Sequence, residues 1–150
     1  MLEVGDTAPE FELQDQTGAR VRLDELLAKG PVVLFFYPRA MTKGCTVESC
    51  YFRDLAAEFE AVGATRVGIS ADGIDRQARF DDQHGLGYPL LSDPDRKVAG
   101  QFGVKRFGPI FNKRATFVID TDRRVLAAIS SETNMEVHAD EALEVLRART

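Results

Sequence analysis

The feature that most constrains the fold is an uninterrupted apolar run, Pro31-Val-Val-Leu-Phe-Phe-Tyr37. It is rich in β-branched and aromatic residues, and an unbroken apolar run of this length is typical of a strand buried on both faces. Pro38 follows directly and ends the strand, because proline has no backbone N–H for the ladder. The sequence therefore predicts a central strand, with the rest of the chain organised around it.

The segments that follow alternate between helix and strand patterns. Over residues 42–62 apolar side chains recur every three or four positions, which predicts one helix with a single buried stripe. The stripe consists of Val47, Tyr51, Leu55, Phe59 and Val62. Before it, DQTG at 15–18 is typical of a turn. After it we expect a strand at 65–70, a helix at 74–84, a short strand at 90–91, a helix at 95–102, a hairpin of 115–120 with 124–129, and a last helix at 139–149.

This order predicts an α/β fold with a mixed central β-sheet flanked by helices on both faces. The chain has 150 residues, with no internal repeat or long linker, so we expect a single domain over 1–150. A formal net charge of −5 with scattered basic residues argues against a nucleic-acid partner. No apolar run approaches the roughly 18 residues of a membrane span. Because the start, MLEVGDTAPEFEL, is acidic and unlike a targeting peptide, we expect a cytoplasmic protein that does not bind membranes.

The chemistry is expected at two cysteines, Cys45 and Cys50. Cellular thiols keep cytoplasmic cysteines reduced, which points to redox chemistry or metal binding rather than a permanent disulfide. Cys45 falls in the first turn of the expected helix, where unpaired N–H groups and the helix dipole favour the reactive thiolate. Nearby, Thr42 supplies a hydroxyl, Gly44 allows close backbone approach, and Pro38 fixes the exit from the strand. The alternative is that Cys45 is only a small buried apolar residue.

The segment FFYPRAMTKGCTVESCYFRD resembles the peroxiredoxins, whose motif Pro-x-x-x-Thr-x-x-Cys is matched by Pro38, Thr42 and Cys45. It is similar in particular to the Q-type subgroup, also called bacterioferritin comigratory proteins, in which a resolving cysteine lies five residues after the peroxidatic one. Cys50 has that spacing. The subgroup also has an arginine before a strand similar to S-T-F-[LVI]-I-D, and Arg114 precedes Ala-Thr-Phe-Val-Ile-Asp.

One residue departs from this pattern. Where the family usually has a proline directly before the Gly-Cys pair, this chain has Lys43. This departure affects the expected rigidity of the loop and the expected rate of the reaction more than it affects the expected mechanism.

The resemblance covers nearly the whole chain and implies a thioredoxin-like fold with thiol-dependent peroxidase activity. Cys45 would attack hydrogen peroxide or an organic hydroperoxide and become sulfenic acid, and Cys50 would resolve it as a disulfide. Thr42 and Arg114 would orient the peroxide and stabilise charge on the leaving oxygen, with Pro38 and Gly44 shaping the site. The resemblance further implies thioredoxin or a similar thiol donor such as glutaredoxin as reductant, no cofactor, no metal, and a monomer in preference to a dimer.

Helix geometry adds one expectation. Five residues along an ideal helix separate two Cα atoms by roughly 8.7 Å, whereas a disulfide seldom spans more than about 7 Å. We therefore expect the first turns of the helix that carries Cys45 and Cys50 to unwind in each cycle.

Other chemistries have less support. A dithiol reductase normally uses C-x-x-C, which this chain lacks. A zinc site would have to recruit His84 and His138 together with the cysteines, without metal-ligand spacing, and neither histidine has a motif for a cysteine hydrolase. A non-enzymatic redox sensor or chaperone on the same fold stays open, because it would use the same thiol.

The least regular stretch is RFGPIFNK at 106–113. Its apolar residues Phe107, Ile110 and Phe111 either cover the site or form a contact surface, or the loop folds back onto its own core.

Overall fold

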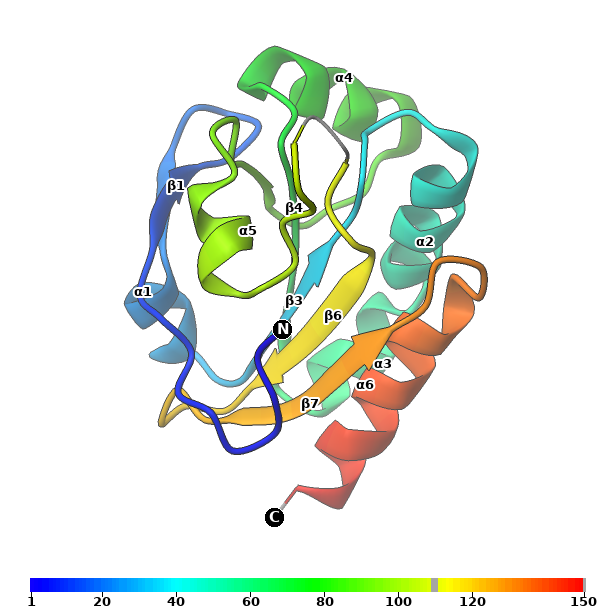
Figure 1. The fold of residues 1–150 in the computed structure, drawn as a ribbon. Helices are drawn as coiled ribbons and strands as arrows, with labels where there is room; N and C mark the ends of the chain where they lie inside the picture. The colour runs from blue at the N-terminus through cyan, green and yellow to red at the C-terminus, as the bar shows by residue number, and fades with distance from the viewer. Residues whose placement is uncertain (109–110, 150) are drawn as a thin grey trace.

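The apolar run forms β3 (Val32–Phe36), which lies inside a seven-stranded sheet in the computed structural model, described over residues 1–108 and 111–149 (Figure 1). All five of its residues are buried. β3 runs parallel to β4 (Thr65–Ser70) and antiparallel to β6 (Ala115–Ile119). The strand order is β2-β1-β5-β4-β3-β6-β7. The other strands are β1 (Glu12–Gln14), β2 (Arg20–Arg22), β5 (Leu90–Ser92) and β7 (Val125–Ser130).

Helices cover both faces of this sheet (Figure 1). Side chains alternate along β3, so that Val32, Leu34 and Phe36 enter one core cluster while Val33 and Phe35 enter the other. The first cluster packs under α1 (Leu23–Leu27) and α5 (Lys97–Gln101), and the second under α2 (Lys43–Asp54), α3 (Ala56–Ala61), α4 (Ile74–His84) and α6 (Glu136–Ala148). The predicted α/β class, a mixed sheet between two helical layers, is confirmed.

The prediction of one helix over 42–62 is wrong in its continuity and at one position of its apolar stripe. The helix breaks at Leu55 (φ −96°, ψ 21°), which separates α2 from α3. Phe59 is buried, and Tyr51, Leu55 and Val62 pack partly buried against the core, as predicted, but Val47 is 46% exposed. The core side of α2 also includes Cys45, Glu48 and Phe52, and Phe52 stacks on Phe35 with ring centroids 4.2 Å apart.

Elements with strong local patterns lie where the sequence predicts them. β4 and α4 match at both ends, and Gly85 ends α4 in the left-handed conformation (φ 56°). The turn at 15–18 is also present, since the Asp15 carboxylate accepts hydrogen bonds from the backbone N–H groups of Thr17 and Ala19. The last helix begins earlier than expected, at Glu136, and therefore includes His138. Within residues 1–108 and 111–149, no helix is both long and apolar enough to span a bilayer.

Candidate active site

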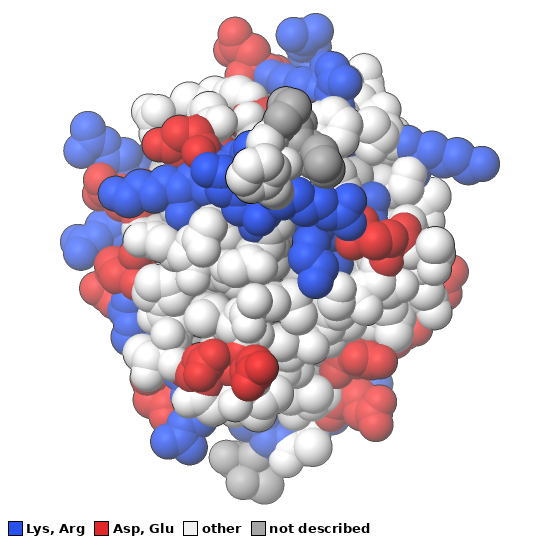
Figure 2. Space-filling model, in the orientation of Figure 1, with Lys and Arg blue, Asp and Glu red and all other residues white. Residues whose placement is uncertain are grey.

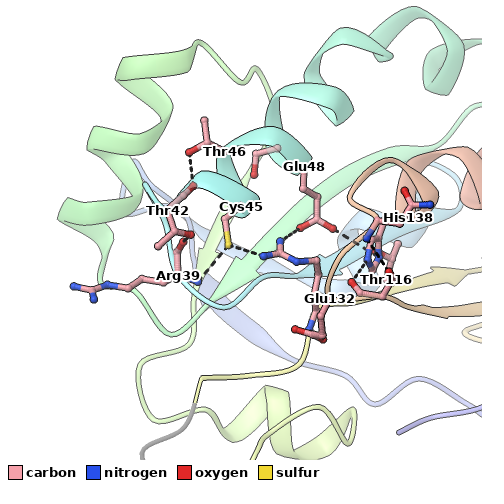
Figure 3. Close-up of polar contacts among 12 residues, drawn as sticks. Arg39, Thr42, Cys45, Thr46, Glu48, Thr116, Glu132 and His138 are labelled. Carbon is pink, nitrogen blue, oxygen red and sulfur yellow. Dashed lines mark hydrogen bonds and ion pairs between the residues drawn. The ribbon is translucent and has the colours of Figure 1, made fainter.

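Cys45 lies in the first turn of α2, and its side chain is fully buried. Two donors face its sulfur: Nη2 of Arg114 lies 3.3 Å from Sγ, and the backbone N–H of Arg39 lies 3.5 Å from it (Figure 3). The guanidinium comes from the residue just before β6, and the N–H from the loop between β3 and α2. The sulfur therefore lies at the N-terminus of a helix and faces two hydrogen-bond donors.

The loop between β3 and α2 contains the predicted site residues Pro38 and Thr42. Pro38 is half-buried directly after the strand. The Thr42 hydroxyl donates to the Arg39 carbonyl at 2.7 Å, and the Thr46 hydroxyl donates to the Thr42 carbonyl at 2.7 Å (Figure 3). Because the Thr42 hydroxyl hydrogen is used in this bond, its lone pairs can accept a hydrogen bond from a substrate.

Arg114 is 5% exposed and bridges two groups. Its Nη1 donates to Oε1 of Glu48 at 2.7 Å, while Nη2 reaches Cys45. Burial by itself lowers the pKa of Arg114, but the Glu48 carboxylate and the Cys45 sulfur outweigh burial and raise the pKa above its ordinary value. The guanidinium therefore keeps its charge in this enclosed position.

Glu48 is a site residue that the sequence analysis missed. It is fully buried, and burial raises its pKa to about 8 although the Arg114 guanidinium acts in the opposite direction. Its Oε2 has no hydrogen-bond partner among the described residues and lies 3.7 Å from Nδ1 of His138. Glu48 follows Cys45 by three residues, so it lies on the same helix face, and this spacing is the signal that could have identified it.

His138 is also buried, and its hydrogen bonds define its state. Nε2 lies 2.9 Å from the Ser131 carbonyl, which can only accept, so Nε2 carries the hydrogen. Nδ1 then accepts from the Thr116 hydroxyl at 2.8 Å. Burial lowers the pKa of His138, which fits this neutral ring. His138 therefore belongs to the surroundings of Glu48, whereas His84 is the last residue of α4.

Gly44 lies against the guanidinium of Arg114. A Cβ built on it would be 3.1 Å from Nη2 of Arg114 and 3.2 Å from Cε of Met135. Such contacts are tighter than normal, so a larger residue would have to displace the arginine or the methionine. The predicted role of close backbone approach fits this geometry.

Cys50 is a partly exposed free thiol on α2, and Cys45 is also a free thiol. The half of the helix around and after Cys50 is attached to its neighbours through backbone carbonyls. Tyr88 Oη donates to the Ser49 carbonyl at 2.7 Å, and Arg66 Nη1 donates to the Phe52 carbonyl at 2.8 Å. The two cysteines thus lie on one continuous helix, of which the later half has external anchors.

The loop at 106–113 does not fold its aromatic residues onto the core. Phe107 is 96% exposed and Phe111 is 53% exposed, with the Arg39 guanidinium 5.9 Å from the centre of the Phe111 ring. Ile110 lies outside the described residues. These exposures favour a contact surface over a loop that packs on its own core.

Basic residues are less scattered than the sequence analysis assumed. Residues 96–119 contain no Asp or Glu and six basic residues: Arg96, Lys97, Lys105, Arg106, Lys113 and Arg114. In the view of Figure 2, Lys and Arg side chains form a band across the upper part of the molecule. The predicted absence of a nucleic-acid partner therefore rests on the net charge alone.

Comparisons with known proteins agree with this geometry. Residues 4–128 match the AhpC/TSA family. The chain is 57% identical to peroxidoxin BcpB from Mycobacterium tuberculosis, whose crystal structure gives a TM-score of 0.97 over 100% of this chain and 99% of that one. It is 35% identical to peroxiredoxin Bcp of Bacillus subtilis, over 97% of this chain and 96% of the relative. The structure of peroxiredoxin Q from Xanthomonas campestris is 30% identical, with a TM-score of 0.84 over 93% and 90% of the two chains.

Proposed function

The chain belongs to the AhpC/TSA family of peroxiredoxins, and from this premise we propose that Cys45 is the peroxidatic cysteine of a thiol peroxidase that reduces hydrogen peroxide and organic hydroperoxides. The observation that carries the proposal is the pair of donors on its sulfur, Arg114 Nη2 at 3.3 Å and the Arg39 N–H at 3.5 Å. A related Xanthomonas campestris bacterioferritin comigratory protein, 29% identical, is described as having alkyl peroxide reduction activity. This relative supports the inclusion of organic hydroperoxides.

In the first step the Cys45 thiolate attacks one peroxide oxygen. The S–O bond forms as the O–O bond breaks, the other oxygen leaves as water or an alcohol after it takes up a proton, and the sulfur becomes sulfenic acid. An ordinary thiol is roughly 3% ionised at pH 7, so full ionisation alone gives only about 30-fold acceleration. The larger part of the rate must come from alignment of the peroxide and from stabilised charge on the leaving oxygen.

Arg114 and Thr42 are suited to those two tasks. Arg114 keeps its charge and one of its donors, Nη2, faces the sulfur, so a peroxide bound there would meet a fixed cation beside the reacting atoms. The Thr42 lone pairs can accept the hydroxyl hydrogen of the peroxide. Glu48 acts as a positioning residue because it holds Nη1 of Arg114.

In the second step Cys50 attacks the sulfenic sulfur, a disulfide forms and water leaves. Five residues of helix hold the two Cα atoms roughly 8.7 Å apart, so α2 must unwind for the disulfide to close. The anchors on Ser49 and Phe52 indicate where unwinding stops, because they hold the later half of the helix. We infer that residues 43–49 unwind, and that thioredoxin or a similar thiol donor then reduces the disulfide.

The proposal is tested by stopped-flow oxidation of the wild type, Cys45→Ser and Cys50→Ser with hydrogen peroxide and tert-butyl hydroperoxide. We expect Cys45→Ser to be inert. Cys50→Ser should consume one equivalent of peroxide and stop, unless an external thiol restores turnover. Turnover by Cys45→Ser at the wild-type rate would overturn the proposal.

A redox sensor on the same fold would use the same sulfur, and turnover separates the two functions. With catalytic amounts of the protein and thioredoxin as reductant, a peroxidase consumes many equivalents of peroxide at a constant rate, whereas a sensor stops after about one equivalent. Arg114 and Glu48 favour the peroxidase, because an enclosed cation beside the sulfur stabilises a leaving oxygen in every cycle.

A further inference from the structure

The loop that faces the Cys45 sulfur is held through its main chain. The Ala40 N–H donates to Oδ2 of Asp72 at 2.7 Å, and the Ala40 carbonyl accepts from Nη2 of Arg76 at 2.8 Å. The carbonyl of Arg39 accepts the Thr42 hydroxyl, so the peptide group between residues 39 and 40 is fixed at both ends. The N–H of Arg39 is the donor that faces the sulfur.

The two side chains that hold Ala40 also bind each other. Nε of Arg76 lies 2.9 Å from Oδ1 of Asp72, whose side chain is only 6% exposed. The Ser70 hydroxyl donates to Oδ2 of Asp72 at 2.6 Å, and Gln77 Nε2 donates to that hydroxyl oxygen at 3.0 Å. This pair, Asp72 with Arg76, is hereafter the Ala40 clamp. Through Ser70 and Gln77 it is fixed to β4 and α4, which lie outside the segment that unwinds.

The loop needs external support because its next residue has an unfavourable backbone. Met41 has φ 65°, in the left-handed region that side-chain-bearing residues rarely adopt. A residue in that conformation persists only where surrounding contacts enforce it. The Ala40 clamp holds the residue directly before Met41, and the residue directly after it, Thr42, is the N-cap of α2. Met41 is therefore held from both sides.

We propose that the Ala40 clamp positions the loop 38–42 for peroxide attack. It thereby also sets the balance between two forms of α2: the wound form, in which the helix is intact from Lys43, and the unwound form, which closes the Cys45–Cys50 disulfide. This inference rests on the proposed peroxidase function. Asp72 and Arg76 act only through backbone atoms of Ala40, so they are positioning residues rather than catalytic ones. The loop and the wound helix are joined at Thr42, whose carbonyl accepts hydrogen bonds from the N–H and the hydroxyl of Thr46. A weaker clamp therefore lowers the stability of the wound form relative to the unwound form. The first step therefore slows and the second step accelerates.

The experiment measures the two steps separately in Asp72→Ala and Arg76→Gln. Peroxide attack is followed by stopped flow as a second-order rate, and disulfide closure by quenched mass spectrometry after a single equivalent of peroxide. For each variant we expect attack to slow roughly tenfold and closure to accelerate several-fold. Over-oxidation of Cys45 to sulfinic acid should fall as well, because faster closure shortens the life of the sulfenic acid.

The matched controls are Asp75→Ala and Arg79→Gln, which remove exposed side chains of the same types from α4. They should leave both rates at wild-type values. Arg76→Lys keeps the charge but loses the two-point contact, so it should fall between the wild type and Arg76→Gln. Thermal unfolding of every variant is measured in parallel. If Asp72→Ala does not fold, Arg76→Gln decides the outcome, because its side chain is 31% exposed.

Opposite changes in the two rates support the clamp, since a general loss of stability would not slow one step and accelerate the other. The inference is overturned if both rates fall together, or if the clamp variants behave like the controls. Failure of the proposed function looks different, because the wild type itself would then show no Cys45-dependent oxidation and no disulfide.

Discussion

At the scale of single residues, the site is defined by one buried cation that faces two acidic groups. Arg114 contacts both the Cys45 sulfur and the Glu48 carboxylate. Burial raises the pKa of Glu48 to about 8, although the Arg114 guanidinium acts in the opposite direction. Near neutral pH this carboxyl is therefore largely protonated, which leaves the charge of the guanidinium available to the sulfur.

The first prediction concerns the pH dependence of stability. The pKa of Glu48 rises from 4.5 to about 8 on folding. Between pH 4.5 and about 8 the folded state therefore binds more protons than the unfolded state, and its stability falls as the pH rises through this range. Between pH 6.5 and 8 the wild type should lose roughly 2 kcal/mol relative to Glu48→Gln, at about 1.4 kcal/mol per pH unit. Urea unfolding of both proteins, each with Cys45→Ser to remove the thiol, measures the difference.

The choice of window matters because His138 titrates in the opposite sense. Burial lowers its pKa, so its contribution to stability is lost as pH falls below its ordinary value of 6.5. Above pH 6.5 this contribution is nearly constant. Parallel stability curves for the two proteins from pH 6.5 to 8 would contradict the assignment of a buried proton to Glu48.

The second prediction concerns Gly44. Alanine in a helix is normally favoured over glycine by up to about 1 kcal/mol, but here the added Cβ meets Arg114 and Met135. Gly44→Ala should therefore change the melting temperature little, yet slow peroxide attack roughly tenfold because it displaces the guanidinium. Gly73→Ala is the control, since no atom lies within 4 Å of its Cβ position. Equal attack rates for the two variants would show that the arginine tolerates the contact.

At the scale of elements, local sequence patterns predicted the parts of the fold that need no distant partner. β3, β4 and α4 have strong apolar or helical patterns and were predicted closely. β1, β2 and α1 are three to five residues long, too short for a periodic signal. The burial of Glu48 on α2 could not be predicted, because its hydrogen-bond partner Arg114 lies 66 residues later in the chain.

The third prediction concerns how far α2 unwinds. The Tyr88 hydroxyl anchors the Ser49 carbonyl, so unwinding should stop at residue 49 in the disulfide form. Because a helical N–H donates to the carbonyl four residues earlier, amide protection should be lost over 46–53 and kept beyond it. Tyr88→Phe removes this anchor. In that variant the loss should extend to residues 54 and 55, with about 1 kcal/mol less stability in the reduced form. Hydrogen exchange of both redox states measures this, and equal protection of 46–53 in the two states would exclude unwinding.

At the scale of the whole molecule, Cys45 and Arg114 come from elements that are 69 residues apart in the sequence. The sheet order places β6 beside β3, which brings the residue before β6 to the N-terminus of α2. The sequence motif predicted this convergence only through a family resemblance, since spacing alone does not give strand order. The single-domain organisation and the cytoplasmic location stay predictions. So do the roles in the reaction of all the predicted site residues: Pro38, Thr42, Gly44, Cys45, Cys50 and Arg114.

The fourth prediction concerns assembly. Phe107 and Phe111 are exposed in a region rich in basic residues, and two copies of such a surface repel each other. We therefore expect a monomer of 16.6 kDa at micromolar concentration and physiological salt. Sedimentation equilibrium of the reduced and disulfide forms measures the mass. A dimer that dissociates in Phe107→Ser would instead identify this loop as the subunit interface.

The Ala40 clamp has a consequence for how such an enzyme can be altered. It contacts only the backbone N–H and C=O groups of Ala40, and every residue except proline has both groups. The exposed Arg39 side chain takes no part in these contacts, so position 39 can be varied in a library to select for bulkier or more polar hydroperoxides. Met41 offers less freedom, because its backbone is left-handed (φ 65°) and its side chain packs against the core.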